Sequence, residues 1–203
     1  MGEYGMFYRG EVPELIGRPG EDPLSDRHLA ATIAFGHIGI LQYADDLPHM
    51  LRIYYMLQQL QSRYTTSSVA EIRYADADGN LLATTNAVAS GVYKRSQIVT
   101  RYQNGCITVV NGNPNGESMV VDAYGKQFEL PPNGYAGWTE DGALDVFSGE
   151  VNGHRGDYAA TPAYIFVDGR GQFVRFAKAA GDGVGICRIL PNGRYEVILV
   201  DNA

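Results

Sequence analysis

The sequence has few of the residues that mark metal, redox or nucleophilic chemistry. Its 203 residues include two cysteines, one tryptophan and four histidines. Cys106 and Cys187 lie in apolar, strand-like patterns with no metal-site spacing, so we interpret them as buried free thiols. A single disulfide stays open as the alternative, because sequence does not show which strands are neighbours. No two histidines have the spacing of a metal-binding helix. The sequence therefore predicts no metal and no cofactor.

Clusters of basic residues and long apolar runs are also absent. The 16 Lys and Arg residues are scattered, and the net charge is -7, which argues against nucleic acid as a partner. The longest mostly apolar stretch, residues 29–41, contains Thr32 and His37 and is too short to span a bilayer. The first 14 residues include acidic residues and lack the apolar core of a signal peptide. The sequence predicts no membrane contact and leaves the compartment open.

No complete catalytic constellation is evident either. There is no GxSxG nucleophile motif. Asp45 and Asp46 are adjacent at a predicted helix start, where capping is the favoured role. The glycine-rich residues 181–185 precede a strand-like run instead of a helix, so they predict a turn or bulge and not a phosphate loop. The sequence therefore identifies no catalytic residue.

The most informative stretch is residues 92–111, with two strand-like runs on either side of Asn104-Gly105. Asn-Gly favours a tight hairpin turn. The outgoing run, Cys106–Val110, is apolar throughout, which is typical of a strand covered on both faces. We interpret the stretch as a core hairpin, with a ligand-binding role for Tyr102 or Arg101 as the alternative.

The first 64 residues predict a loop-rich and helical lead. Residues 1–24 are rich in Gly, Pro and acids, and Ser25 or Asp26 is suited to cap a helix that ends near Phe35. His37 follows between two glycines, where a structural histidine is favoured over a ligand. A second helix, from about Pro48 to Tyr64, carries apolar residues at spacings of three or four. Its stripe consists of Met50, Ile53, Leu57, Leu60 and Tyr64. A stripe of this width predicts docking against another surface.

Residues 65–203 have the pattern of turns and short strands that is typical of an antiparallel β domain. Asn-Gly and Asp-Gly pairs recur between short β-prone runs. The predicted strands are 69–74, 81–89, 92–102, 106–110, 118–123, 127–130, 135–138, 144–147, 163–167, 172–177, 185–190 and 195–200. The sequence thus predicts a mainly β fold, an antiparallel β-sandwich preceded by an α-helical segment. The Asp168-Gly169-Arg170-Gly171 turn predicts a local ion pair that shapes a hairpin.

The order of these elements resembles the C-terminal part of glycoside-hydrolase-type proteins, in which a (β/α)₈ barrel precedes a β-sandwich. The resemblance lies in MLRIYYMLQQLQSRY, SQIVTRYQNGCITVVNGN, FELPPNGYAGW and AYIFVDGRG. It implies that residues 25–64 correspond to the last helical elements of such a barrel. A whole barrel needs roughly 200 residues, and about 64 precede the sandwich here. The resemblance therefore transfers no catalytic carboxylate to this chain.

Three hypotheses for function follow from these observations. The first is a non-catalytic C-terminal portion of a carbohydrate-active enzyme, whose partner is a missing upstream catalytic domain or a second copy bound through the helix Met50–Tyr64. The second is a free-standing carbohydrate-binding sandwich, with Tyr102 and Trp138 as candidate glycan-stacking residues. The third is a small hydrolase that uses His37 and carboxylates of the lead. These carboxylates are Glu14, Asp22 and Asp26.

Overall fold

The protein folds as one broad antiparallel sheet with helices on one face, in a computed structural model that describes residues 23–39, 47–113 and 115–200. Two helices precede the strands, which confirms the prediction of a mainly β, antiparallel fold behind a helical segment. No helix among these described residues is long and apolar enough to cross a membrane.

The helices and strands have the following bounds. The helices are α2 (Pro23–Ala34), α3 (Leu47–Tyr64), α4 (Thr84–Ser90) and the 3₁₀ turn η1 (Val92–Arg95). The first strands are β1 (Val69–Ala75), β2 (Leu81–Ala83), β3 (Gln97–Tyr102), β4 (Cys106–Asn111), β5 (Met119–Ala123), β6 (Lys126–Leu130) and β7 (Tyr135–Thr139). The later strands are β8 (Asp145–Val151), β9 (His154–Ala160), β10 (Tyr164–Asp168), β11 (Val174–Arg175), β12 (Ala180–Gly181), β13 (Val184–Ile189) and β14 (Tyr195–Val200).

Ten strands form the main sheet, in the order β14-β13-β10-β9-β8-β7-β4-β3-β1-β2. Every neighbouring pair is antiparallel, and most neighbours follow one another in the chain. Two hairpins, β5–β6 and β11–β12, leave this order and form separate two-stranded sheets. The second β layer of the predicted sandwich consists of these hairpins.

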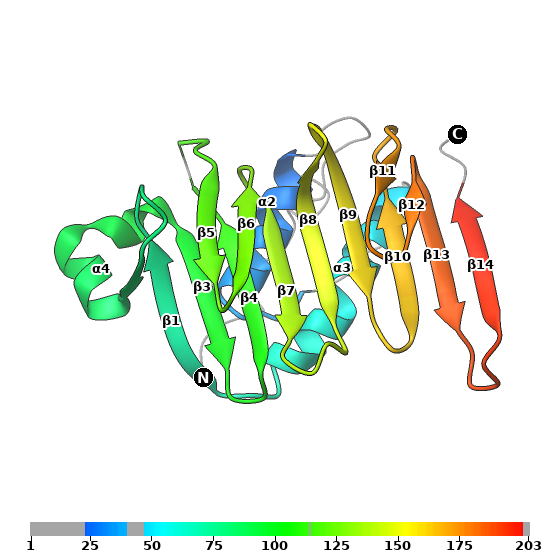
Figure 1. The fold of residues 1–203 in the computed structure, drawn as a ribbon, viewed down its shortest axis with the longest axis horizontal. Coiled ribbons are helices and arrows are strands. Elements are labelled where there is room, and N and C mark those ends of the chain that lie inside the picture. The colour runs from blue at the N-terminus through cyan, green and yellow to red at the C-terminus, as the bar shows by residue number, and fades with distance from the viewer. Residues whose placement is uncertain (1–22, 40–46, 114, 201–203) are drawn as a thin grey trace, which may run out of the picture.

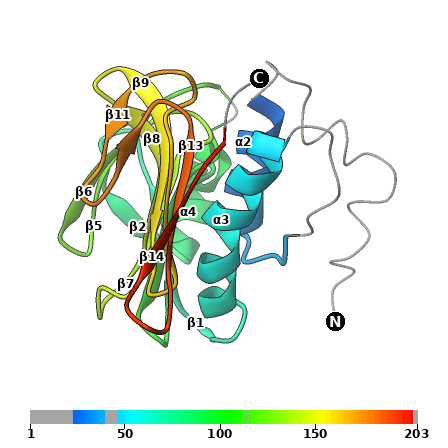
Figure 2. The same cartoon turned by 90° about the vertical axis from the view of Figure 1, so that its right-hand side faces the viewer.

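The three layers are visible when the sheet is seen edge-on. Helices α2 and α3 cover one face, and the β5–β6 and β11–β12 hairpins lie on the other (Figure 2). One apolar core lies between the helices and the sheet and includes Leu60 and Phe166. A second core lies under β5–β6 and includes Met119 and Trp138. The predicted helical lead and β domain therefore share one core.

Strand β4 runs through the middle of these layers. All six of its residues are buried. Cys106 and Val110 belong to the helix-side core, whereas Ile107 and Val109 belong to the hairpin-side core. The prediction of a strand covered on both faces is confirmed. The Asn104-Gly105 turn joins β3 to β4 as predicted, and Gly105 takes the positive φ of 77° that this turn requires.

The predicted docking of the second helix is confirmed. Ile53, Leu57, Leu60 and Tyr64 of α3 are buried in the helix-side core. The partner of this stripe is the sheet of the same chain, so the stripe itself is not left open. Self-association through the helix Met50–Tyr64 stays a prediction.

Several predicted elements differ from those observed. Residues 81–89 were expected to form one strand, but only β2 is extended and α4 follows it. Gly91, with a positive φ of 81°, closes that helix through a hydrogen bond from its N–H to the Val88 carbonyl. The first helix begins at Pro23, before the two residues expected to cap it, because proline suits a first helical turn. Strand β9 was not predicted, since it begins with the polar residues His154 and Arg155.

Candidate functional site

The main polar constellation of the described residues is a cluster of ionised side chains between the helices and the sheet. We call it the buried ion cluster. Its members are Asp26 of α2, Arg52 of α3, Arg155 and Asp157 of β9, Asp168 of β10, and Arg170 in the following turn. Among the described residues, three carboxylates and three guanidinium groups balance one another in charge.

Arg170 lies at the centre of the buried ion cluster. Its Nη1 and Nη2 donate to the two oxygens of Asp26 at 2.8 and 2.7 Å, which is the bidentate geometry that guanidinium and carboxylate groups favour. Its Nε donates to Oδ2 of Asp157 at 2.6 Å. Asp26 and Asp157 are 144 and 13 residues away in sequence, so this one side chain joins α2 to the sheet.

This arrangement corrects the predicted local ion pair of the turn after β10. The Asp168 carboxylate does shape that turn, because Oδ1 accepts a hydrogen bond of 2.8 Å from the backbone N–H of Arg170. The guanidinium group instead points to Asp26 and Asp157, and Arg52 of α3 pairs with Oδ2 of Asp168 at 2.8 Å. The backbone of Arg170 has a positive φ of 51°, a conformation that arginine rarely adopts.

Arg155 extends the buried ion cluster to the turn before β7. Its Nε lies 3.2 Å from Oδ2 of Asp26. Its two Nη atoms donate to the carbonyl oxygens of Pro132 and Asn133 at 2.9 and 2.8 Å. A turn of the motif LPPNG is thereby fixed to the same carboxylate that binds Arg170.

The electrostatics of Asp157 and Arg170 favour their ionised forms. Burial alone raises the pKa of Asp157, but Arg170 and Arg52 outweigh it and bring this pKa down to about 2. The pKa of Arg170 is raised above its usual value: burial opposes this shift, and the charges of Asp157 and Asp26 outweigh it. Both shifts keep Asp157 and Arg170 ionised at neutral pH. Through its bonds to Asp26 and Asp157, Arg170 attaches α2 to β9.

Two asparagines organise the loops at the same end of the sheet. Asn111, fully buried, donates to the carbonyl oxygens of Glu117 and Leu130 at 2.8 Å each, and its Oδ1 accepts from the side chain of Gln97. Asn113 accepts from the backbone N–H of Asn115 at 2.8 Å. The residues 111–113 and the LPPNG turn are thus joined by one set of hydrogen bonds.

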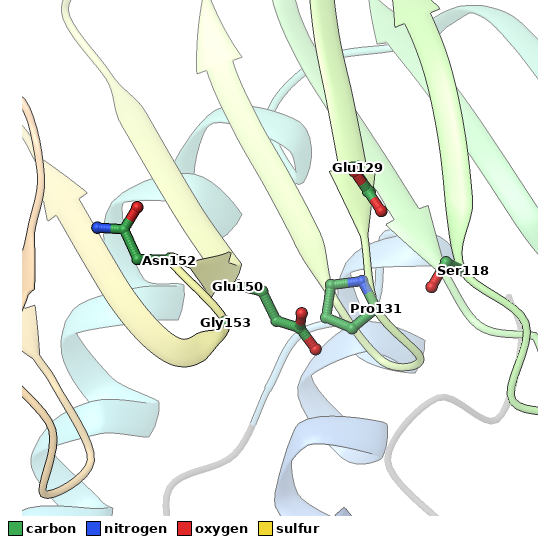
Figure 3. A pocket seen from close by; sticks show the side chains of 6 residues that line it. All are labelled: Ser118, Glu129, Pro131, Glu150, Asn152 and Gly153. Carbon is green, nitrogen blue, oxygen red and sulfur yellow. The ribbon is translucent and has the colours of Figure 1, made fainter.

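An open polar hollow of about 240 Å³ lies on the hairpin side of the sheet. Figure 3 shows its lining residues at the ends of β5 and β6 and at the β8–β9 turn: Ser118, Glu129, Pro131, Glu150, Asn152 and Gly153. Two carboxylates, an amide and a hydroxyl suit hydrogen bonding to a hydroxylated ligand. No aromatic side chain lines it, and the described residues contain no group of His, Cys, Asp and Glu suited to hold a metal ion.

The two predicted glycan-stacking residues lie inside the protein. Tyr102 is 4% exposed in the helix-side core, where its ring stacks on Tyr64. Trp138 is 5% exposed, and its ring is covered by Phe128 at 5.3 Å and by the Lys126 ammonium at 4.8 Å. Neither ring presents a face to a ligand in this structure. Stacking of a sugar on Trp138 stays a prediction that requires the β5–β6 hairpin to move.

The remaining candidates are distributed over the molecule. Arg101 is half-buried near the end of β3 and pairs with Glu140 at 2.8 Å. His37 lies next to α2, where its carbonyl oxygen accepts a hydrogen bond from Tyr64. Of the lead carboxylates, Asp26 belongs to the buried ion cluster and not to the edge of a cleft. Glu14, Asp22, Asp45 and Asp46 lie outside the described residues.

Both thiols are free, as predicted, but they differ in exposure. Cys106 is buried, and this burial raises the pKa of its thiol to about 12. Cys187 on β13 is half-buried, so the interpretation of both as buried holds for Cys106 alone.

Sequence reasoning missed most of the buried ion cluster because its partners are far apart in the chain. The only local signal was the Asp168-Gly169-Arg170-Gly171 turn. Comparison with known family models, with curated proteins and with solved structures finds no significant match. The fold and the local chemistry are therefore the basis for any functional proposal.

Proposed function

We propose that this chain is a non-catalytic C-terminal portion of a carbohydrate-active, glycoside-hydrolase-like enzyme, in which catalysis belongs to sequence upstream. The observation that carries the proposal is the attachment of α2 and α3 to the β domain. The buried ion cluster and the helix-side core join them as one unit. Helices fixed in this way can brace a preceding barrel and hold it in a set position against the sheet.

The ion cluster supports an accessory role over a catalytic one. Glycoside hydrolysis needs one carboxyl group that can give up a proton and a second that can attack or activate water. Asp26, Asp157 and Asp168 are each bonded to a guanidinium group, and the low pKa of Asp157 keeps it ionised. These carboxylates support assembly of the domain, and the catalytic pair is assigned to the upstream barrel.

Two of the motifs that carry the resemblance meet in the structure. Asn111 bonds to the carbonyl oxygen of Leu130 in the LPPNG turn, and Arg155 holds the same turn from β9. Residues of two motifs that bond to one another are expected to occur together in β domains of this kind.

A second candidate, a free-standing carbohydrate-binding module, is favoured by one observation. The polar hollow offers the carboxylates of Glu129 and Glu150 and the amide of Asn152, which are acceptors and donors for sugar hydroxyl groups. In this alternative the glycan binds at the hollow, and Tyr102 and Trp138 contribute only to packing.

The two candidates differ in the size of the natural polypeptide and in glycan binding. An antibody raised against this chain should detect, on a denaturing gel of the source cells, a band well above 22.2 kDa if it is part of a larger enzyme. A band at 22.2 kDa, with glycan binding that Glu129→Gln plus Glu150→Gln abolishes, would favour the binding module. Glu140→Gln, another exposed glutamate, is the control variant. A 22.2 kDa band without glycan binding would overturn both candidates.

A further inference from the structure

The two ends of the ten-stranded sheet are built differently. At one end β2 has only three residues, and α4 packs beside it and β1 (Figure 1). A short strand beside a helix is a common way to block further strand pairing. At the other end β14 has six residues in unbroken register with β13, and no described residue pairs with its outer side.

Strand β14 also lacks the usual devices that protect a sheet edge. It contains no proline, lysine or bulge. Tyr195, Val197 and Leu199 are 67, 65 and 78% exposed and form one apolar row. Its single charged residue, Glu196, is paired with Arg188 of β13 at 2.9 Å. The edge is therefore apolar, and its one charge is balanced within the chain.

The backbone of the same three residues faces outward. The N–H of Leu190 bonds to the carbonyl of Arg194, so the next pair, Ile189 with Tyr195, is a pair without mutual hydrogen bonds. The N–H of Ile189 indeed bonds to Ala163 on its other side. Alternation along the ladder then leaves the N–H and C=O groups of Tyr195, Val197 and Leu199 directed to the open edge.

We propose that this edge binds a second copy of the chain, through antiparallel pairing of β14 with β14 about a two-fold axis at Val197. A two-fold axis normal to the sheet keeps every side chain on its own face, and directly opposite residues of an antiparallel pair lie on the same face. Odd-numbered residues of one β14 therefore lie opposite odd-numbered residues of the other. The outward-facing backbone groups of the two copies thus meet. Val197 then lies opposite Val197, and Tyr195 lies opposite Leu199 of the other copy. All three outward-facing residues of each copy form paired hydrogen bonds.

Charge and side-chain chemistry favour a second copy as the occupant. In this register Glu196 lies opposite Ile198, so the two carboxylates do not face each other, and each keeps its Arg188. The two apolar rows lie side by side and shield each other from water. A two-fold contact closes on itself, so the expected product is a dimer and not a fibre.

The test is the solution mass of the whole chain as a function of concentration. Because a single strand edge is a small interface, we expect a weak dimer, with the mass rising from 22.2 kDa toward twice that value between about 1 µM and 1 mM. Val197→Lys, which brings two like charges together at the axis, should stay at 22.2 kDa. Val120→Lys, at an equally exposed valine of β5, should behave as the unchanged chain.

A second variant and a second measurement keep the test sharp. Val197→Pro removes an outward N–H without removing a bond to β13, so it should also prevent pairing. Amide exchange should slow about tenfold at high concentration for Tyr195, Val197 and Leu199, and stay unchanged for Glu196 and Ile198. A monomer at 1 mM, a dimer that survives Val197→Lys, an open-ended polymer, or protection of Glu196 and Ile198 instead would overturn the proposal.

Discussion

At the scale of single residues, Arg170 has the largest structural role in the buried ion cluster. It binds two carboxylates that have almost no contact with water, Asp26 and Asp157. Removing one partner of such a group leaves buried charge without compensation, which costs more than the ion pair itself contributes. Removal of Arg170 alone should therefore destabilise the protein more than removal of one partner of an exposed ion pair.

We therefore predict that Arg170→Met lowers the free energy of unfolding by about 3–5 kcal/mol, as measured by urea denaturation. Arg101→Met is the matched control, because Arg101 pairs with Glu140 at the surface and such exposed pairs contribute about 0–1 kcal/mol. Equal losses for the two variants would show that the cluster is not the attachment we describe.

The cluster also predicts sensitivity to acid. The pKa of Asp157 is about 2 in the folded protein, below the usual aspartate value of about 3.9 in an unfolded chain. A lowered pKa adds stability above the unfolded value and loses it as the pH falls through the folded value. The free energy of unfolding should thus decrease between about pH 4 and pH 2. Asp157→Asn should flatten this part of the profile in urea titrations, and an unchanged slope would contradict the assignment.

At the scale of elements, the sequence patterns predicted the parts governed by periodicity and missed those governed by distant contacts. The stripe of α3 and the all-apolar run of β4 were evident because burial leaves a regular spacing. Strand β9 was missed because its polar residues serve Arg170 and other distant groups. Residues 84–89 include the β-prone residues Thr84, Thr85 and Val88, yet they form a helix that Gly91 closes.

The contact between α3 and β7 gives a prediction at this scale. Gly137 of β7 lies directly beneath Leu60, and a Cβ atom at position 137 would come within 2.7 Å of a Leu60 methyl group. Since Leu60 is fully buried, it has little room to move. Gly137→Ala should therefore cost about 1–3 kcal/mol by overpacking.

A double-mutant cycle supplies the control for this overpacking. Leu60→Ala alone should cost about 2–5 kcal/mol, because it leaves a cavity. In the double variant the new methyl group occupies part of that cavity, so its cost should be less than the sum of the two single costs. Strict additivity in urea denaturation would mean that the two residues do not contact each other.

At the scale of the whole molecule, the layers form one cooperative unit in spite of their different origins in the chain. Helices α2 and α3 share the helix-side core with strands from β3 to β13, and the sheet shares its other face with β5–β6. The sequence predicted that helices and sheet pack together. It did not predict the ion cluster that fixes their relative position, because Asp26 and Arg170 are 144 residues apart.

This unity predicts coincident unfolding of helices and sheet. Trp138 is the sole tryptophan and lies in the hairpin-side core, so its fluorescence reports the layer farthest from the helices. Circular dichroism at helix wavelengths reports α2 and α3. Both signals should change at the same urea concentration, because the sheet between them belongs to both cores. Arg170→Met tests the cause: if the cluster couples the layers, the helix signal should be lost first in that variant, whereas Arg101→Met should keep the two transitions together.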